Sequence, residues 1–107
     1  MNPSDKIVRF ENIAKELAKL YEAKNSDYGD SFGNTWKKLG PISALTRMSD
    51  KLERLIQLMT KGGQKVKNES ILDTLSDLAA YSIMTIIEIE NANGITKTAP
   101  GQGTYEG

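Results

Sequence analysis

The sequence predicts an all-α fold, a helical bundle of three long helices and one short helical segment that is completed by oligomerisation. Apolar residues recur at spacings of three and four through three long stretches of the 107-residue chain. Glycine and proline stand at the ends of these stretches, where helices stop and begin. The β-branched run 83–89 could suit a strand, but it lies inside a helical pattern of about 25 residues, and this length favours a helix.

The first helix is expected to start at Ser4, a good N-cap, and to reach about Lys24. Its predicted core stripe consists of Ile7, Phe10, Ile13, Ala14, Leu17, Leu20 and Tyr21. Residues 25–40 break the pattern with glycines and turn formers. Within them, Tyr28, Phe32 and Trp36 stand four apart, so a short helical turn would place the three rings on one side.

The next helix is expected to begin at Pro41 and to end at about Lys61, before Gly62 and Gly63. Its predicted core stripe consists of Ile42, Leu45, Met48, Leu52, Leu55, Ile56 and Met59. Residues 62–68 are expected to form a basic turn. The last helix would be capped by Asn68 and run from Glu69 to about Asn93, with Gly94 as its stop. Residues 1–94 then form one domain, and residues 95–107 form a loose tail.

Composition excludes several kinds of chemistry. The 14 basic and 14 acidic residues cancel, which argues against bulk nucleic-acid binding. The chain has no cysteine and no histidine, so disulfides, thiolate zinc sites and histidine bases are absent. Acid–base or metal chemistry would use Asp, Glu, Lys or Tyr, and the metal that suits carboxylates alone is Mg²⁺ or Mn²⁺.

The expected location is the cytoplasm, with no membrane partner. We expect no apolar run in this sequence to approach the roughly 20 residues that a helix needs to span a bilayer. The first residues, Met1 to Asp5, are polar and do not look like the core of a signal peptide.

Two helix faces carry charges in a regular pattern. Arg47, Asp50, Lys51 and Arg54 share one face of the helix that starts at Pro41, roughly opposite its apolar stripe. Glu69, Asp73 and Asp77 form a column on the last helix, where like charges four apart repel. A nearby cation or an opposing basic face would explain the column, and the alternative is an ordinary solvated face.

Beyond Ala80 the last helix is apolar nearly all round. The acidic face continues as Ala80, Met84 and Ile87, and the opposite side is apolar as well. Three long helices of one chain have difficulty covering such a helix, so a second copy is expected to pack there. The acidic column would then border an interface groove, which suits a hard cation or a bound metal–phosphate complex.

The segment from Lys24 to Asp30 is a candidate recognition loop. It holds Lys24, Asn25, Asp27 and Tyr28, and an aromatic ring can stack on a base whose edge accepts hydrogen bonds from Asn or donates them to Asp. The alternative is a plain turn after a helix.

Three blocks of sequence resemble a known family. They are residues 24–32 (Lys-Asn-x-Asp-Tyr-Gly-Asp-Ser-Phe), 47–55 (Arg-Met-Ser-Asp-Lys-Leu-Glu-Arg-Leu) and 69–81 (Glu-Ser-x-x-Asp-Thr-Leu-x-Asp-Leu-Ala-x-Tyr). In this order they are similar to the nucleotide modification associated domain family of phages and bacteria. That family looks related to the all-α, MazG-like nucleoside triphosphate pyrophosphohydrolases. The resemblance implies a helical bundle, Mg²⁺ and a nucleotide ligand.

The acidic motif matches the MazG-like pattern in part. Asp50 and Glu53 match two acids of a Glu-Glu-x-x-Glu motif, and Asp77 matches the Asp of Glu-x-x-Asp. Asp73 stands one position before Thr74, which occupies the place of the missing Glu. The resemblance therefore implies Asp50, Glu53, Asp73 and Asp77 as metal ligands.

Two functions fit these residues. The first is Mg²⁺-dependent hydrolysis of a nucleoside triphosphate in nucleotide-pool or base-modification metabolism of a phage, with Glu69 and Asp77 as catalytic acids. The expected substrate-binding residues are Lys24, Asn25, Asp27, Tyr28, Phe32, Trp36, Arg47, Lys51, Arg54 and Tyr81. The second is a binding protein that sequesters a nucleotide signal of host defence without cleaving it, which the incomplete acidic motif favours.

Overall fold

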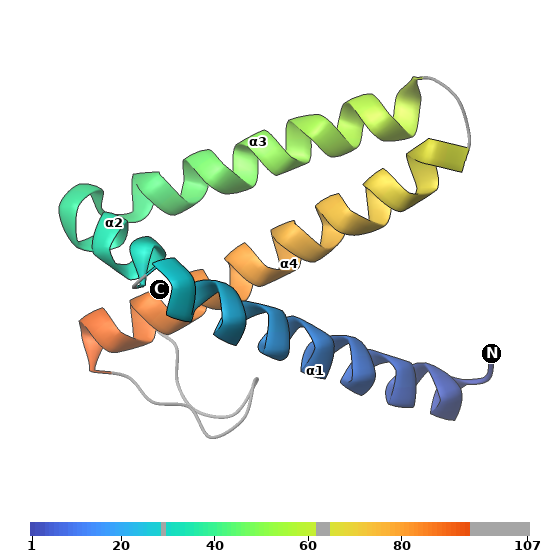
Figure 1. Cartoon of the computed structure of the whole chain (residues 1–107), viewed down its shortest axis with the longest axis horizontal. Helices are drawn as coiled ribbons and strands as arrows, with labels where there is room; N and C mark the ends of the chain where they lie inside the picture. Colours follow the sequence, from blue (N-terminus) through green and yellow to red (C-terminus); the bar gives the residue numbers. More distant parts are fainter. Residues whose placement is uncertain (29, 62–64, 95–107) are drawn as a thin grey trace.

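A computed structural model describes residues 1–28, 30–61 and 65–94, and these residues form helices joined by short connections (Figure 1). Helix α1 spans Pro3–Tyr28, α2 spans Ser31–Leu39, α3 spans Pro41–Thr60 and α4 spans Lys65–Asn93. No strand occurs in the described ranges, so the all-α prediction is confirmed. The predicted tail, 95–107, and the glycines at 62 and 63 lie outside the described residues.

Helices α3 and α4 form an antiparallel hairpin, which is the most extensive helix contact in the chain (Figure 1). Two contacts set its register: Lys51 pairs with Asp77, and the Ser82 hydroxyl lies 3.8 Å from the Met48 sulfur. This register places buried Leu55 across from buried Thr74. The Thr74 hydroxyl donates to the Ser70 carbonyl at 2.7 Å, so its polar atom is satisfied inside α4.

The other two helices pack at one end of this hairpin. Helix α2 contacts both α3 and α4, and α1 crosses α4 obliquely with its C-terminal half (Figure 1). Leu17 and Tyr21 of α1 are half-buried, whereas Ile7, Phe10, Ile13 and Leu20 are exposed. The predicted stripe of α1 is therefore covered only in part, because α4 reaches only the C-terminal half of the helix.

Two helix boundaries differ from the sequence prediction. Helix α1 continues through Asn25, Ser26 and Asp27, so the expected loop is mostly helix, since weak helix formers lower stability without forbidding a helix. The chain turns instead at Asp30, which has a left-handed φ of 58° and donates its N–H to the Asn25 carbonyl. Helix α4 starts at Lys65 and includes Asn68, so Asn68 is not its N-cap.

The predicted core stripe of α3 is largely wrong for a single chain. Leu55 is buried and Met48 is half-buried as expected. The remaining members are exposed: Ile42, Leu45, Leu52, Ile56 and Met59. The side of α3 that faces α4 carries Ala44, Lys51 and Leu55, because the small Ala44 and the Lys51–Asp77 ion pair suit the close contact with α4 better than a row of large side chains does.

Helix α4 contains a longer apolar segment than the sequence analysis expected. Residues Asn68–Asn93 are long and apolar enough to cross a membrane by length and composition alone. The expectation that no apolar run approaches this length was therefore wrong. The same composition is found in helices that are covered by protein on all sides.

The N-terminus of α2 provides a test of the local structure. The Asp30 carboxylate accepts a hydrogen bond from the Gly33 N–H at 3.4 Å, and a Cβ at residue 33 would lie 2.4 Å from an oxygen of the same carboxylate. Gly33→Ala should therefore displace the cap and lower the free energy of unfolding by about 1 kcal/mol.

The matched background is Asp30→Gly, which removes the carboxylate and keeps the left-handed turn without strain. In that background Gly33→Ala should raise stability by up to about 1 kcal/mol, because alanine is the better helix former. Urea unfolding of the four proteins measures both effects. The same sign in both backgrounds would show that the cap does not determine the cost.

Candidate functional site

All four helices contribute to one pocket of about 290 Å³. Its polar lining comes from the C-terminal end of α1, the start of α2, the first half of α3 and the middle of α4. These residues are Lys24, Asn25, Ser31, Arg47, Ser76 and Asp77. The apolar and aromatic lining consists of Leu17, Leu20, Tyr21, Phe32, Ala80, Tyr81 and Met84. The pocket thus combines aromatic surface with charged groups of both signs.

An aromatic pair positions the arginine of this pocket. The rings of Phe32 and Tyr81 stack with their centroids 6.1 Å apart and their planes 20° from parallel. The Arg47 guanidinium lies 5.3 Å from the centre of the Phe32 ring and 5.9 Å from that of Tyr81. Within the described part of the chain, no carboxylate forms an ion pair with Arg47. Among the described residues, the contacts that position its charge are therefore the two π contacts.

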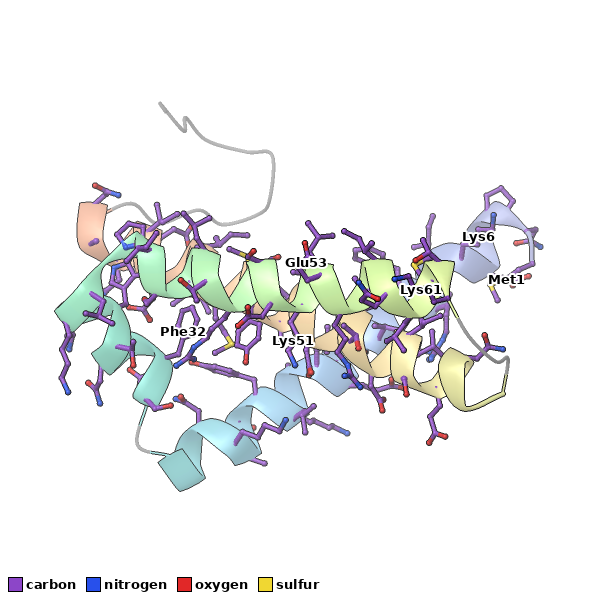
Figure 2. The ribbon with its side chains drawn as sticks, turned by 90° about the horizontal axis from the view of Figure 1, so that it is seen from above. Met1, Lys6, Phe32, Lys51, Glu53 and Lys61 are labelled. Carbon is purple, nitrogen blue, oxygen red and sulfur yellow. The ribbon has the colours of Figure 1, made fainter. Side chains whose placement is uncertain are left out.

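An ion pair closes the α3–α4 side of the pocket. The Lys51 ammonium lies 3.0 Å from a carboxylate oxygen of Asp77, and Figure 2 shows that Lys51 and Glu53 leave α3 on different sides. The two side chains are 29% and 39% exposed. Asp77 also lines the pocket, so Lys51 acts on the pocket through its partner.

A second cavity of about 430 Å³ adjoins the first along α1 and α4. It shares Lys24, Ser76 and Asp77 with the first pocket and adds Glu16 and Asp73. Glu16 was not predicted from the sequence, where it appears as one of several charges on α1. The sequence feature that could have indicated Glu16 is its position one residue before Leu17, at the border of the apolar stripe of α1.

The structure brings together part of the predicted site. The predicted residues that line the first pocket are Lys24, Asn25, Phe32, Arg47, Asp77 and Tyr81. Asp73 lines the adjoining cavity, and Lys51 reaches the pocket through Asp77. The predicted residues that line neither cavity are Trp36, Asp50, Glu53, Arg54 and Glu69. The side chains of Asp27 and Tyr28 lie outside what the structure describes.

Of the three rings expected on one side, that of Tyr28 lies outside what the structure describes. Phe32 pairs with Tyr81 of α4, and Trp36 of α2 is half-buried. Spacing along the sequence could not reveal this partner, because it depends on how α2 meets α4.

The carboxylates do not form a metal site within the described ranges. No three acidic side chains there form a group that could hold a metal ion. Asp50 and Glu53 are exposed on α3, and Asp77 is occupied by Lys51. The donor set that Mg²⁺ requires is therefore not assembled by these residues, and the magnesium site stays a prediction.

Tyr21 lies where α1 crosses α4. Burial, followed by the charges of Asp30 and Glu88, raises the pKa of the Tyr21 phenol above its usual value of 10.0. The phenol therefore stays neutral across the physiological range, as a hydrogen-bonding group at the pocket wall.

A family model described as nucleotide modification associated domain 1 matches residues 24–89. The chain belongs to this family. The match covers more than half of the chain and includes every residue of the Arg47 and Lys51 contacts described above. Neither a curated protein nor a solved structure matches the chain.

The Lys51–Asp77 pair should contribute little to stability because both side chains are partly exposed. In a double-mutant cycle of Lys51→Met and Asp77→Asn, followed by urea unfolding, the coupling free energy should be below about 1 kcal/mol and should shrink in high salt. A coupling of about 3 kcal/mol would instead indicate a desolvated, structural pair.

Proposed function

We propose that this nucleotide modification associated domain binds a nucleotide in the pocket between its four helices. The observation that carries the proposal is Arg47, a half-buried guanidinium stacked on Phe32 and Tyr81 and facing the pocket. Planar guanidinium groups recognise phosphate through paired hydrogen bonds. The matched family is the second support, since its description names nucleotide modification.

The remaining lining suits the other parts of a nucleotide. Lys24 adds a second positive charge at the pocket edge, and Asn25 and Ser31 offer neutral hydrogen-bonding groups. The half-buried rings of Tyr21 and Tyr81 offer flat surface on which a base can stack, and buried Phe32 supports Tyr81 from the side of α2. The volume, about 290 Å³, is at the lower end of the range for small-molecule sites. We therefore propose that the occupant is a mononucleotide or part of a larger one.

Binding without hydrolysis is the simpler proposal for these residues. It needs Arg47, Lys24 and the aromatic rings, and it requires no metal. A domain of this kind could sequester a nucleotide, in a phage or in the bacterial cytoplasm. In this proposal Lys51 neutralises the carboxylate of Asp77, which lines the pocket. Without Lys51, the negative charge of Asp77 would repel a phosphate that approaches Arg47.

Loss of the Arg47 guanidinium should weaken binding strongly. Arg47→Met keeps the length of the side chain and removes the charged donors, so nucleotide affinity should fall roughly 10- to 100-fold, as expected for losing a charge-assisted hydrogen bond. Isothermal titration with nucleoside mono-, di- and triphosphates, with and without Mg²⁺, provides the measurement.

Arg54→Met is the matched control. Arg54 lies seven residues further along the same face of α3 and lines neither cavity, so its loss should leave the affinity unchanged. Equal losses in the two variants would point to general attraction by positive charge and would contradict a site at Arg47.

Hydrolysis of a nucleoside triphosphate is a second candidate, and the adjoining cavity favours it. A phosphate chain that begins at Arg47 and passes Lys24 would enter a space lined by Glu16, Asp73 and Asp77. Acids there could join a metal carried by the nucleotide, as the proposed relation to MazG-like pyrophosphohydrolases implies. Because the described acids do not form a metal group in this structure, no catalytic step is assigned to them.

Pyrophosphate release separates the two candidates. A hydrolase should release pyrophosphate from at least one triphosphate in the presence of Mg²⁺ or Mn²⁺, and Asp73→Asn should abolish the release while nucleotide binding persists. The binding protein should give no release with any nucleotide that it binds. Tight binding without turnover would therefore exclude the hydrolase.

A further inference from the structure

One side of the α3–α4 hairpin is a continuous apolar surface in the isolated chain. On α3 it comprises Ile42, Leu45, Leu52, Ile56 and Met59, all of which are exposed. On α4 it comprises Leu72, Leu75 and Ile86, which are exposed as well. We call this surface the open face. A small soluble protein rarely leaves so many large apolar side chains in contact with water on one surface.

The two rows lie on the same side of the hairpin for a geometric reason. On α3, Leu45 and Ile56 each follow a buried residue, Ala44 and Leu55, by one position. One residue of an α-helix corresponds to a rotation of about 100°. The open-face row of α3 is therefore turned by about 100° from the side that contacts α4.

The same offset occurs on α4. Leu75 follows buried Thr74 by one position, and Ile86 lies about three turns beyond Leu75 on the same side of the helix. Each row is turned by about 100° from the contacting side of its own helix, in the direction in which that helix winds. Because the two helices run in opposite directions, these two rotations bring both rows to the same side of the hairpin. Helix α1 lies on the other side (Figures 1 and 2), where its residues line a cavity together with Ala80, Ile83 and Met84 of α4.

We propose that a second copy of this chain packs on the open face, so that two α3–α4 hairpins form one four-helix bundle about a two-fold axis. The row on α3 has the alternating spacing of three and four that helices use in bundles, with Ser49 at the one polar position. A two-fold interface requires a surface that complements itself, and two antiparallel apolar rows provide one.

The exposed area agrees with such a partner. The large apolar side chains of the open face are each between 43% and 65% exposed. Together they present several hundred Å² of apolar surface, on the order of the roughly 800 Å² that each partner buries in a standard interface. The proposal is independent of the nucleotide pocket, since no residue of the open-face row on α3 lines that pocket.

A lipid bilayer is a less suitable partner for this surface. The apolar segment of α4 also carries Glu69, Asp73, Asp77, Glu88 and Glu90. Acidic side chains oppose insertion of a helix into the hydrocarbon core, and this segment has no basic residue that could compensate them. A protein partner covers one side of α4 and leaves these acids on the others.

Light scattering after size exclusion tests the proposal. The full chain should have at least twice the mass of 11.8 kDa, and Leu52→Glu should halve it. Val8→Glu is the matched control, because Val8 of α1 is 57% exposed, close to the 53% of Leu52, but lies away from the open face. A parent mass of 11.8 kDa, or equal dissociation by both variants, would overturn the proposal.

A thiol probe keeps the test valid if Leu52→Glu does not fold. The chain has no cysteine, so Ser49→Cys introduces a single thiol at the centre of the α3 row. In the proposed dimer this thiol should react with a maleimide more slowly than that of Ser4→Cys, and its rate should rise on dilution as the dimer dissociates. Equal rates for the two exposed serine positions, or binding of the monomer to phosphatidylcholine vesicles through the open face, would contradict a second copy.

Discussion

The register of α3 against α4 is the constraint on which the rest of this structure depends. Lys51 pairs with Asp77, and Ser82 contacts Met48, only because the two helices run antiparallel with this alignment. A shift by one residue on either helix would turn the contacting side by about 100° and separate Arg47 from Tyr81. The alignment is held by few buried side chains, of which Ala44 allows close approach and Thr74 satisfies its own hydroxyl within α4.

The same register divides the hairpin into three sides with different surroundings. The side between the helices contains the ion pair and the packing. The side toward α1 and α2 contains the pocket, where Arg47 is placed by its contacts with Phe32 and Tyr81. The third side is the open face. An amphipathic helix has one apolar stripe, whereas α4 is apolar on two sides, and this explains why a helix of a small domain has the hydropathy of a membrane span.

The contacts of Arg47 with two aromatic rings determine the chemistry of the pocket. An arginine that stacks on rings keeps its positive charge and its planar N–H groups, both of which can serve a ligand. The neighbouring acid, Asp77, is neutralised by Lys51 from the next turn of α3. Two residues of one α3 face therefore affect the charge of the pocket, Arg47 directly and Lys51 through Asp77. This charge favours a phosphate-bearing ligand at the site we propose.

The sequence alone determined the helices, because apolar spacing and the glycines and prolines at their ends are local properties. It also determined that chemistry here runs without histidine or cysteine, and it identified Arg47, Asp77 and Tyr81 through blocks that resemble the family. Tertiary structure decided which side of each helix is covered. Sequence periodicity located the apolar row of α3 correctly but assigned it to the core, since periodicity cannot tell a surface covered by the same chain from one left for a partner. The pairing of Phe32 with Tyr81 and the place of Glu16 in the second cavity likewise arise where helices meet, between residues far apart in the chain, and no local pattern encodes such a contact.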